Sequence, residues 1–284
     1  MRDQAESLRR KVALSRQKQA KTISIISGKG GVGKSSTAVN FALELTRKKY
    51  KVLIIDLDIG MGNIEVMLGL HAEKTLVDLL EGQQDISDVI ASGPNNLSYI
   101  SGGSGLNDLF SLTDAQKEIF FEKYHELASE YDFILFDMGA GISRDSLFFI
   151  LASDECIVIT TPEPTALTDA YSMIKLLIKH KGDMSINIVM NRCKSEKEGM
   201  HALEQFEQII HRFLSIRIRK LGILLEDRIV PESIMKQSPY MIWSKRSKIK
   251  RSMEHLTATY LSYARSSQPG PKTFIEKLRS FFQS

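Results

Sequence analysis

Ser27-Gly-Lys-Gly-Gly-Val-Gly-Lys-Ser-Ser36 is the stretch that decides the fold of this chain. It contains the pattern G-x-x-x-x-G-K-[ST], in which glycines allow backbone N–H groups to close around phosphate oxygens. The β-branched run Thr22–Ile26 before it is typical of a buried strand, and a helix-like stretch, 37–47, follows it. Because strand, loop and helix occur in this order, the stretch predicts a phosphate-binding loop at a helix N-terminus, in preference to a glycine-rich turn with chance lysines.

The loop pattern predicts roles for two of its residues and leaves a third unexplained. We expect Lys34 to reach the terminal phosphates of a nucleotide and Ser35 to ligate Mg²⁺. Lys29 is a second lysine that the pattern does not need. Its role must be explained from the rest of the sequence.

Further apolar runs alternate with helix-like stretches along the chain. Strands that are apolar on both faces and are separated by helices favour a mostly parallel sheet that is covered on both sides. We therefore predict one doubly wound α/β domain. The expected strands are 22–26, 52–55, 133–136, 156–159, 186–190 and 221–225, and the expected helices are 37–47, 114–129, 166–179 and 199–214.

The composition excludes several classes of protein. The 284 residues are 43% hydrophobic, as in an ordinary globular protein with a core. No apolar stretch approaches the roughly 18 residues of a membrane-spanning helix, and the N-terminus is polar where a signal peptide would be apolar, so we expect a cytosolic protein. Cys156 and Cys193 lack C-x-x-C spacing, so they predict neither a zinc site nor a disulfide, and we expect both to be reduced and partly buried.

The net charge of +4 is modest, but basic residues gather near the C-terminal end of the predicted domain. Such a cluster is usually a solvated helix face, and contact with an anionic surface is the alternative. The cluster consists of Lys245, Arg246, Lys248, Lys250 and Arg251.

Carboxylates follow two of the predicted strands, as phosphoryl transfer requires near the metal and the attacking water. Asp56 and Asp58 end the strand that begins at Val52, and they lie on the same side of the chain if it is extended there. Asp137 follows the run Phe133–Phe136 and precedes Gly139-Ala-Gly141, a flexible stretch that could respond to a γ-phosphate. The alternative, that these acids are helix caps or turn formers, is weakened by their occurrence together with the loop.

Residues 21 to 260 resemble the MinD/ParA (SIMIBI-class) ATPases. The resemblance rests on Lys29-Gly-Gly-Val-Gly-Lys-Ser35, which is similar to the deviant Walker A box of that family. It also includes Asp56-Leu-Asp-Ile-Gly-Met-Gly-Asn63, Asp137-Met-Gly-Ala-Gly141, Thr161-Pro-Glu-Pro-Thr-Ala-Leu-Thr-Asp-Ala170 and Met190-Asn-Arg192. In such ATPases the extra lysine contacts the nucleotide phosphates of the partner subunit, so the resemblance implies that Lys29 makes ATP a link between two subunits.

The resemblance implies a role for each matching residue. Lys34 would bind the phosphates, Asp58 would position the attacking water, and Lys29 would assist catalysis across the dimer. Ser35 would bind Mg²⁺ directly, and Asp56 and Asp137 would act on the metal through its waters. The remaining nucleotide-binding residues would be Gly30, Gly31, Val32, Gly33, Ser36 (on the α-phosphate) and Asn191 (on the adenine edge). Where relatives have a proline before a Glu-Asp pair, this chain has Leu225-Glu226-Asp227, which puts adenine contacts from that loop in doubt.

The N-terminal segment carries the pattern Asp3-Gln-Ala-x-x-Leu-Arg9. Asp3 could cap a short helix with Glu6 three residues later, and Ala5, Leu8 and Val12 would share one face. A disordered tail with an accidental cap is favoured by composition alone. The pattern before a MinD-like core is, however, similar to that of the FlhG (YlxH) flagellar regulators. This resemblance implies that Asp3, Gln4, Ala5, Leu8 and Arg9 bind and stimulate the signal-recognition-particle-type GTPase FlhF, and it also implies contacts with flagellar C-ring proteins.

The C-terminal piece, 272–283, follows a helix-breaking Ser266-Ser-Gln-Pro-Gly-Pro271. Its apolar residues would span about 120° of a helix, which is typical of a helix that lies at a membrane interface. A helix packed on its own core is an equally supported alternative in the absence of ATP. The residues concerned are Phe274, Ile275, Leu278, Phe281 and Phe282.

These observations predict three parts: an activator segment at 1–20, a MinD-like ATPase domain at 21–266, and a linker with a membrane-targeting helix at 267–284. We expect a cytoplasmic, Mg²⁺-dependent ATPase that binds ATP and ADP, dimerises with ATP and visits the inner face of the cell membrane. The alternative is a ParA-like partition protein that binds DNA through the basic cluster. An electron-transferring iron protein would need a cysteine just after Asp137, and the chain has none there; a related tyrosine kinase would have a tyrosine-rich tail, and no tyrosine follows Tyr263.

Overall fold

A computed structural model describes residues 19–58, 63–82, 84–103, 113–141, 144–266 and 273–282. An eight-stranded sheet forms the centre of these residues, in the order β3-β4-β2-β5-β1-β6-β7-β8. All neighbouring strands are parallel except β3 and β4. The strands are β1 (Lys21–Ile26), β2 (Val52–Leu57), β3 (Ala91–Ser92), β4 (Ser98–Ile100), β5 (Phe133–Met138), β6 (Glu155–Thr160), β7 (Ser185–Cys193) and β8 (Arg219–Leu225).

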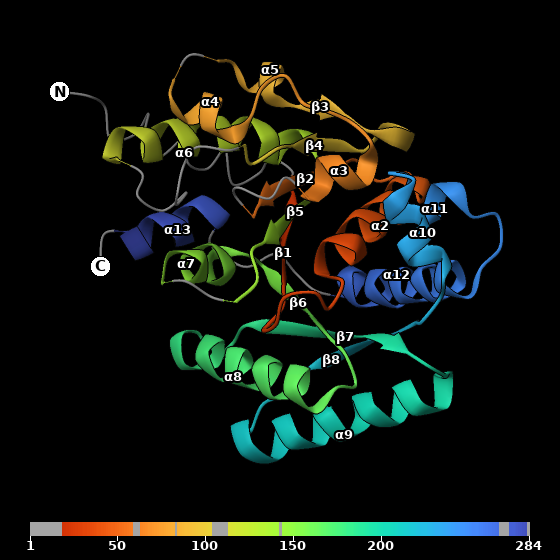
Figure 1. Cartoon of the computed structure of the whole chain (residues 1–284). Helices are drawn as coiled ribbons and strands as arrows, with labels where there is room; N and C mark the ends of the chain where they lie inside the picture. The colour runs from red at the N-terminus through yellow and green to blue at the C-terminus, as the bar shows by residue number, and fades with distance from the viewer. Residues whose placement is uncertain are drawn as a thin grey trace.

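Helices cover both faces of this sheet, so the predicted doubly wound α/β fold is confirmed (Figure 1). Alternate residues of the buried strands supply two apolar clusters: Ile23 and Ile25 face one of them, and Ile26 faces the other. The helices are α2 (Lys34–Arg47), α3 (Asn63–Leu68), α4 (Leu76–Leu80), α5 (Ile86–Val89), α6 (Asp114–Glu130), α7 (Arg144–Ala152), α8 (Pro164–His180), α9 (Glu196–Leu214), α10 (Ile229–Met235), α11 (Tyr240–Trp243), α12 (Lys248–Ser266) and α13 (Phe274–Phe282), with a 3₁₀ turn, η1, at Pro94–Asn96.

The two clusters divide the helices between the faces. Buried residues of α2, α3, α11 and α12 form one cluster with the sheet. Those of α4, α6, α7, α9 and α13, and those of α8 except Ala166, belong to the other. Because helices cover both faces of the sheet, β2, β5 and β6 are buried at every position, and this explains their nearly continuous apolar sequences.

Each predicted strand and helix is present, and most are longer than predicted by one to three residues at an end. The strands β3 and β4 were missed because they contain two and three residues, too few to show a hydrophobic period. Both cysteines are free and buried, as expected, although their burial is complete and not partial.

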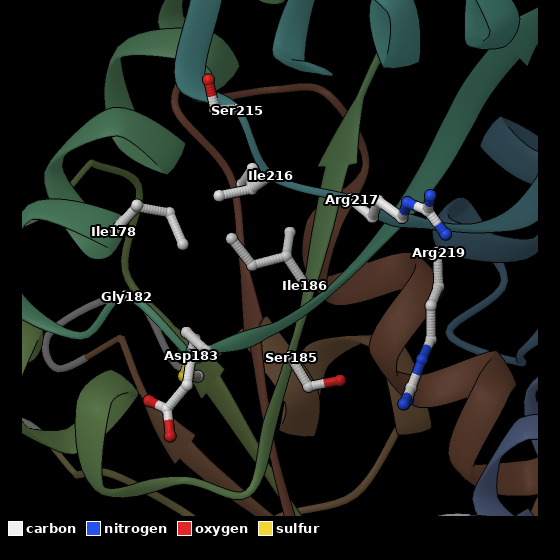
Figure 2. A pocket seen from close by; sticks show the side chains of 10 residues that line it. Ile178, Gly182, Asp183, Ser185, Ile186, Ser215, Ile216, Arg217 and Arg219 are labelled. Carbon is white, nitrogen blue, oxygen red and sulfur yellow. The ribbon is translucent and has the colours of Figure 1, made fainter.

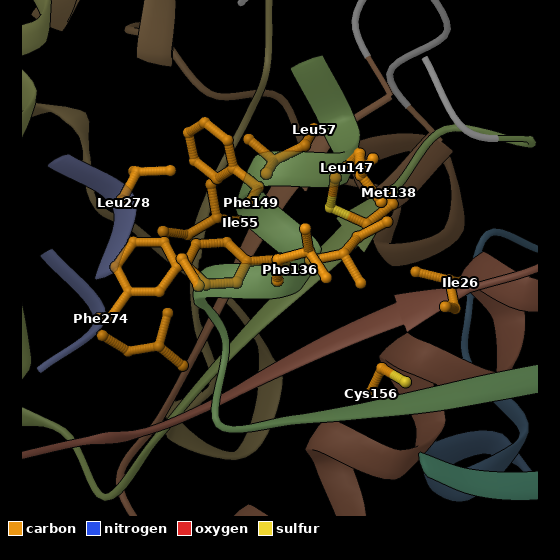
Figure 3. Packing of buried hydrophobic residues seen from close by; sticks show 14 of the residues in the cluster. Ile26, Ile55, Leu57, Phe136, Met138, Leu147, Phe149, Cys156, Phe274 and Leu278 are labelled. Carbon is orange, nitrogen blue, oxygen red and sulfur yellow. The ribbon is translucent and has the colours of Figure 1, made fainter. Parts of the chain in front are cut away.

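Helix α13 packs against the core, as one of the two alternatives for the C-terminal piece predicts. Phe274, Ile275 and Leu278 are buried, and the ring of Phe274 stacks on that of Phe136 with 5.0 Å between centroids (Figure 3). The ring of Phe281 stacks on that of Phe148 at 5.5 Å. The apolar face that could meet a membrane is therefore occupied by the protein itself in this state, and its membrane role remains a prediction; the side chain of Phe282 lies outside the described residues.

Candidate nucleotide-binding site

Parallel pairing brings the phosphate loop and the carboxylates to one edge of the sheet. Ile25, next to the last residue of β1, pairs with Asp137 on β5, and Asp137 pairs in turn with Asp56 on β2. The loop that leaves β1 therefore begins beside both aspartates. Their juxtaposition was predicted from the carboxyl ends of the strands, and the register confirms it.

The loop ends at the N-terminus of α2, where backbone donors are free for an anion. Gly33 is the N-cap, with φ of 91°, and it supplies no side chain to cap the first turn, which also contains no acidic residue. The first N–H groups of a helix without such partners, together with the helix dipole, favour bound phosphate.

Two glycines of the loop are required by close neighbours. A Cβ on Gly28 would lie 2.5 Å from the backbone carbonyl carbon of Asp169 in α8. A Cβ on Gly33 would lie 2.4 Å from Nδ2 of Asn191. Neither position leaves room for a side chain, so glycine allows the loop to lie close against α8 and the end of β7.

Lys34 and Asp137 form a buried ion pair beneath the loop. The Lys34 Nζ donates to Asp137 Oδ1 at 2.7 Å and to Ser35 Oγ at 3.1 Å. Burial raises the pKa of Asp137, and the positive charge of Lys34 opposes that rise. The second carboxylate oxygen, Oδ2, is buried and has no hydrogen-bond partner among the described residues. An unsatisfied buried oxygen beside a serine hydroxyl fits the water shell of a Mg²⁺ ion.

Asp56 faces the same space from β2. Its Oδ1 accepts a hydrogen bond from the backbone N–H of Asp58 at 2.9 Å, and its Oδ2 accepts one from Ile64 at 3.4 Å. Burial, reinforced by the nearby charge of Asp137, raises the pKa of Asp56 to about 7. A cation placed between these two carboxylates would remove their mutual repulsion.

Asp58 connects the two segments that are expected to respond to the nucleotide. Its Oδ2 accepts a hydrogen bond from Asn63 Nδ2 at 3.2 Å, which ties it to the start of α3. Its Oδ1 lies close to Gly139, where an added Cβ would be 3.4 Å away. The intervening residues 59–62 lie outside the described part of the chain. Asp58 is thus partly exposed between α3 and the segment after Asp137, where it could orient a water molecule.

The second lysine of the loop lies at the surface. The Lys29 Nζ donates to Thr165 Oγ1 at 3.1 Å and forms a 3.4 Å ion pair with Glu163 Oε2, at the start of α8. Both charged side chains are largely exposed, so water competes for this contact. The role of Lys29 in contacting a second subunit stays a prediction. Its partners on α8 were missed, because only the fold brings them near the loop.

A cavity of about 520 Å³ extends from the loop between β7, β8, α10 and α12. Asn191 bounds it: Nδ2 donates to the carbonyl of Val32 at 2.8 Å, and Oδ1 accepts from the N–H of Arg192 at 2.9 Å. Its lining combines apolar side chains with polar ones, among them Asn191, Arg192 and Arg228, as suits a flat base with polar edge contacts. The lining includes Gly33, Ser36, Thr37, Asn191, Leu224, Leu225, Glu226, Asp227, Pro231, Ile234, Tyr240 and Ile249.

The loop at 225–227, whose contact with a base was in doubt, does line this cavity. Asp227 itself is engaged with the backbone: Oδ1 accepts from Ile229 at 3.1 Å, and Oδ2 accepts from Ile249 at 3.4 Å. The carboxylate therefore joins the start of α10 to the start of α12 and shapes the wall of the cavity. A direct contact between Asp227 and adenine remains untested.

The donor set fits a magnesium nucleotide better than a protein-only metal centre. Among the described residues, no group of three or more His, Cys, Asp and Glu side chains is placed to hold a metal ion. Mg²⁺ is commonly held by one or two carboxylates, a hydroxyl and the phosphates themselves, and Ser35, Asp56 and Asp137 offer such ligands. The ion would neutralise charge on the phosphates; the protein residues would fix its position.

The remaining predicted residues are placed as follows. Gly30, Gly31 and Val32 complete the loop, and Ser36 lies at its end, buried at the start of α2. The activator residues Asp3, Gln4, Ala5, Leu8 and Arg9 lie outside the described residues. In the basic cluster, Lys250 has a structural task, since its Nζ donates to the carbonyls of Met241 and Ser244 at 2.9 and 2.8 Å.

A second cavity, of about 460 Å³, lies at the opposite ends of β7 and β8 (Figure 2). Ile178, Ile186 and Ile216 point into it, and Arg217 and Arg219 lie at one side. None of the predicted nucleotide-binding residues lines it. It is therefore no part of the nucleotide site.

Similarity to known proteins agrees with this geometry. A family model described as an AAA domain matches residues 20–190. The antiactivator FleN of Pseudomonas aeruginosa is 29% identical over 258 residues, which cover 90% of this chain and 92% of the relative. The flagellum site-determining protein YlxH of Helicobacter pylori is 29% identical over 267 residues, covering 92% and 90%. The septum site-determining protein MinD of Pyrococcus horikoshii, solved with Mg-ADP, superimposes with a TM-score of 0.71 at 26% identity, over 86% of this chain and 97% of that one.

No described helix of the chain is both long and apolar enough to cross a membrane.

Proposed function

This chain belongs to the MinD/ParA-type ATPases, and from this we propose that it is an ATP-dependent dimerising switch that regulates the number and placement of flagella. It hydrolyses ATP slowly with Mg²⁺, associates reversibly with the inner face of the cell membrane, and stimulates the GTPase FlhF through its N-terminal segment. Flagellar C-ring proteins are its further partners.

The proposal of an ATP-dependent switch rests on the different positions of the two lysines of the loop. Lys34 is 6% exposed and paired with Asp137, so it serves the nucleotide of its own subunit. Lys29 is 42% exposed, and it contacts only exposed groups at the start of α8, through a weak ion pair with Glu163 and a hydrogen bond to Thr165. A cation at the mouth of the site is free to reach phosphates in a second copy of the chain.

Slow hydrolysis follows from the placement of the carboxylates. Asp58 is partly exposed and bonded to Asn63, so a water that it orients would also meet bulk solvent in a single subunit. Closure by the partner would exclude that solvent and complete the site, which makes ATP turnover depend on dimerisation.

The flagellar role rests on a separate line of support. The relative named as a flagellum site-determining protein matches this chain over nine-tenths of both lengths. The pattern Asp3-Gln-Ala-x-x-Leu-Arg9 precedes the ATPase domain. A short amphipathic segment at the end of a chain suits docking in the groove of a partner, here FlhF.

Membrane association is assigned to α13. Its apolar face, now on the core, would give a weak and reversible anchor, since partial burial of a few large side chains contributes about 5 kcal/mol before the cost of ordering. Two such helices on a dimer would bind about 10²–10⁴ times more tightly through avidity. Dimerisation by ATP thereby controls location.

The test of the switch is the molar mass by light scattering with ADP and with ATP. We expect the Asp58→Ala variant to be a dimer with ATP and a monomer with ADP, and Lys29→Ala in the same background to stay monomeric. Lys197→Ala, which removes an exposed lysine of α9, is the matched control and should dimerise normally. Dimers of normal strength in the Lys29→Ala variant would refute the mechanism.

The flagellar role is tested with FlhF directly. A peptide of residues 1–20 should raise the GTP turnover of FlhF, and Gln4→Ala should weaken that effect. A peptide that leaves GTP turnover unchanged would contradict the role of the N-terminal segment while leaving the ATP switch intact.

A further inference from the structure

The surface formed by α10, α11 and the start of α12 is strongly basic, and we name it the α10–α12 surface. Between 228 and 251, seven basic residues stand against one acidic residue, so this segment carries a formal charge of +6 in a chain of +4. The rest of the chain is therefore net negative, and the positive charge is concentrated here. The basic residues are Arg228, Lys236, Lys245, Arg246, Lys248, Lys250 and Arg251, and the acid is Glu232.

All of these basic side chains except Lys250 are exposed. Lys250 is held by the carbonyls at the end of α11, so it supports the surface without being free to bind a ligand. Lys236 lies over the ring of Trp243, with its Nζ 4.0 Å from the centroid. This cation–π contact places the Lys236 ammonium group against the face of the Trp243 ring.

Large apolar side chains protrude among these charges. Met235, the last residue of α10, is 86% exposed, and Ile234 and Ile242 are 38% and 37% exposed. The neighbouring α3 adds Val66, which is 51% exposed. Helix α3 packs against α10, and a Cβ on Gly69, just after α3, would lie 2.8 Å from the carbonyl oxygen of Gln237, just after α10. An exposed methionine at a helix end, directly followed by Lys236 in a strongly basic segment, is more than scattered surface hydrophobicity.

The α10–α12 surface and α13 belong to opposite faces of the sheet. Helices α11 and α12 pack in one apolar cluster with α2, whereas α13 packs in the other with α6 and α7. Figure 1 shows α10 and α11 together at one side of the molecule and α13 at the other. A partner that meets the α10–α12 surface therefore need not displace α13.

We propose that the α10–α12 surface binds anionic lipid membranes directly, as a second membrane contact that is independent of α13. Lysine and arginine near an anionic leaflet each contribute about 1 kcal/mol, and apolar side chains that project between them enter the headgroup region. The Met235 side chain projects from the protein, so it can insert between lipid headgroups. Nucleic acid would satisfy the charges and leave Met235 and Ile242 without a partner.

The experiment is sedimentation of the full chain, with ADP, with vesicles of one third phosphatidylglycerol and two thirds phosphatidylcholine. The test variant is Lys245→Gln with Arg246→Gln, and its control is Lys194→Gln with Lys197→Gln, an exposed pair near the start of α9 that gives the same net charge. The test variant should bind about thirtyfold more weakly, from about 1 kcal/mol for each charge and 1.36 kcal/mol for each factor of ten. The control should bind as the wild type does.

A second pair of variants tests the apolar part. Met235→Gln should weaken vesicle binding severalfold, and Met200→Gln, at a residue of α9 that is 40% exposed, should not.

Equal losses of vesicle binding in the Lys245/Arg246 variant and in its Lys194/Lys197 control would show that net charge alone acts, and would overturn the proposal. So would retention of vesicle binding by the test variant while it loses binding to a short DNA duplex. Because binding is measured with ADP, a failure here is distinct from failure of the ATP-dependent switch.

Discussion

Replacing Phe274 by alanine should release α13 from the core. Phe274 is 4% exposed, and its ring contacts those of Phe136, Tyr124 and Phe149, with centroids 5.0, 4.8 and 6.0 Å away. Truncation of a buried phenylalanine to alanine costs about 3–5 kcal/mol. We take the lower end, about 3 kcal/mol, because the site lies under a terminal helix and can collapse. The equilibrium between docked and released α13 should then shift about 150-fold toward release.

The polar contacts of α13 cannot offset this loss. Lys277 pairs with Asp154 at 2.8 Å, and Arg279 pairs with Glu118 at 2.6 Å. The Arg279 and Glu118 side chains are largely exposed, and such pairs contribute at most about 1 kcal/mol. The apolar contacts of Phe274 and its neighbours therefore set the stability of the docked state.

Hydrogen exchange of the α13 amides measures this equilibrium directly, because local opening exposes them to solvent. In the Phe274→Ala variant the amides of 274–282 should exchange about 150-fold faster. Those of β5, which lies beneath α13, should keep their rates. Phe213→Ala, at a position that is 64% exposed, is the control and should change neither. Unchanged exchange in α13, or equal acceleration in α13 and β5, would refute the view that the helix docks and opens as a separate unit.

Three further predictions concern the nucleotide site and the buried charges. The pKa of Asp56 is about 7 in the folded protein, whereas its ordinary value is 3.8. Between pH 3.8 and 7 the folded state therefore keeps a proton that the unfolded state has lost, and the free energy of unfolding falls as pH rises through that range. The melting temperature of the nucleotide-free Asp56→Asn variant should therefore exceed that of the wild type at pH 8 and approach it, or fall below it, at pH 4. Gly33→Ala should abolish binding of a fluorescent ATP analogue, since its methyl would overlap the Asn191 side chain, whereas Gly31→Ala, whose methyl would have no atom within 4 Å, should weaken binding less. The buried carboxylate of Glu155 forms ion pairs with Lys21 of β1 at 2.6 Å and with Arg219 of β8 at 3.1 Å. Glu155→Gln should therefore lower the free energy of unfolding, measured by urea titration, by about 3 kcal/mol.

The sequence predicted the sheet and the phosphate site well because each depends on a local pattern. Buried parallel strands are apolar on both faces, so runs such as Val52–Ile55 are visible without an alignment. The loop requires glycine at fixed positions, and the aspartates follow strands directly. These signals lie within about ten residues of chain, which is the range over which a pattern can be recognised.

The cavity for the base and the docking of α13 could not be predicted in the same way. Leu224, Pro231 and Ile249 line the cavity, yet they belong to three elements whose meeting depends on the whole fold. The docked and membrane-bound states of α13 use the same apolar face, so the sequence supports both equally. Only the complementary surface on the core, centred on Phe136, favours the docked state here.

The ion pair with Glu163 engages Lys29 within its own subunit, so it should oppose ATP-dependent dimerisation weakly. An ion pair at 3.4 Å between two largely exposed side chains contributes at most about 1 kcal/mol. Its removal in Glu163→Gln should therefore strengthen ATP-dependent dimerisation by about fivefold for each Lys29, or about thirtyfold at most in a symmetric dimer, while the Thr165 hydroxyl still receives Lys29 at 3.1 Å. Dimer dissociation constants from sedimentation velocity would measure this effect against Lys29→Ala, which should prevent dimerisation. If Glu163→Gln prevented it as well, Glu163 would belong to the dimer interface, and its contact with Lys29 would be part of the active arrangement and not a weak restraint.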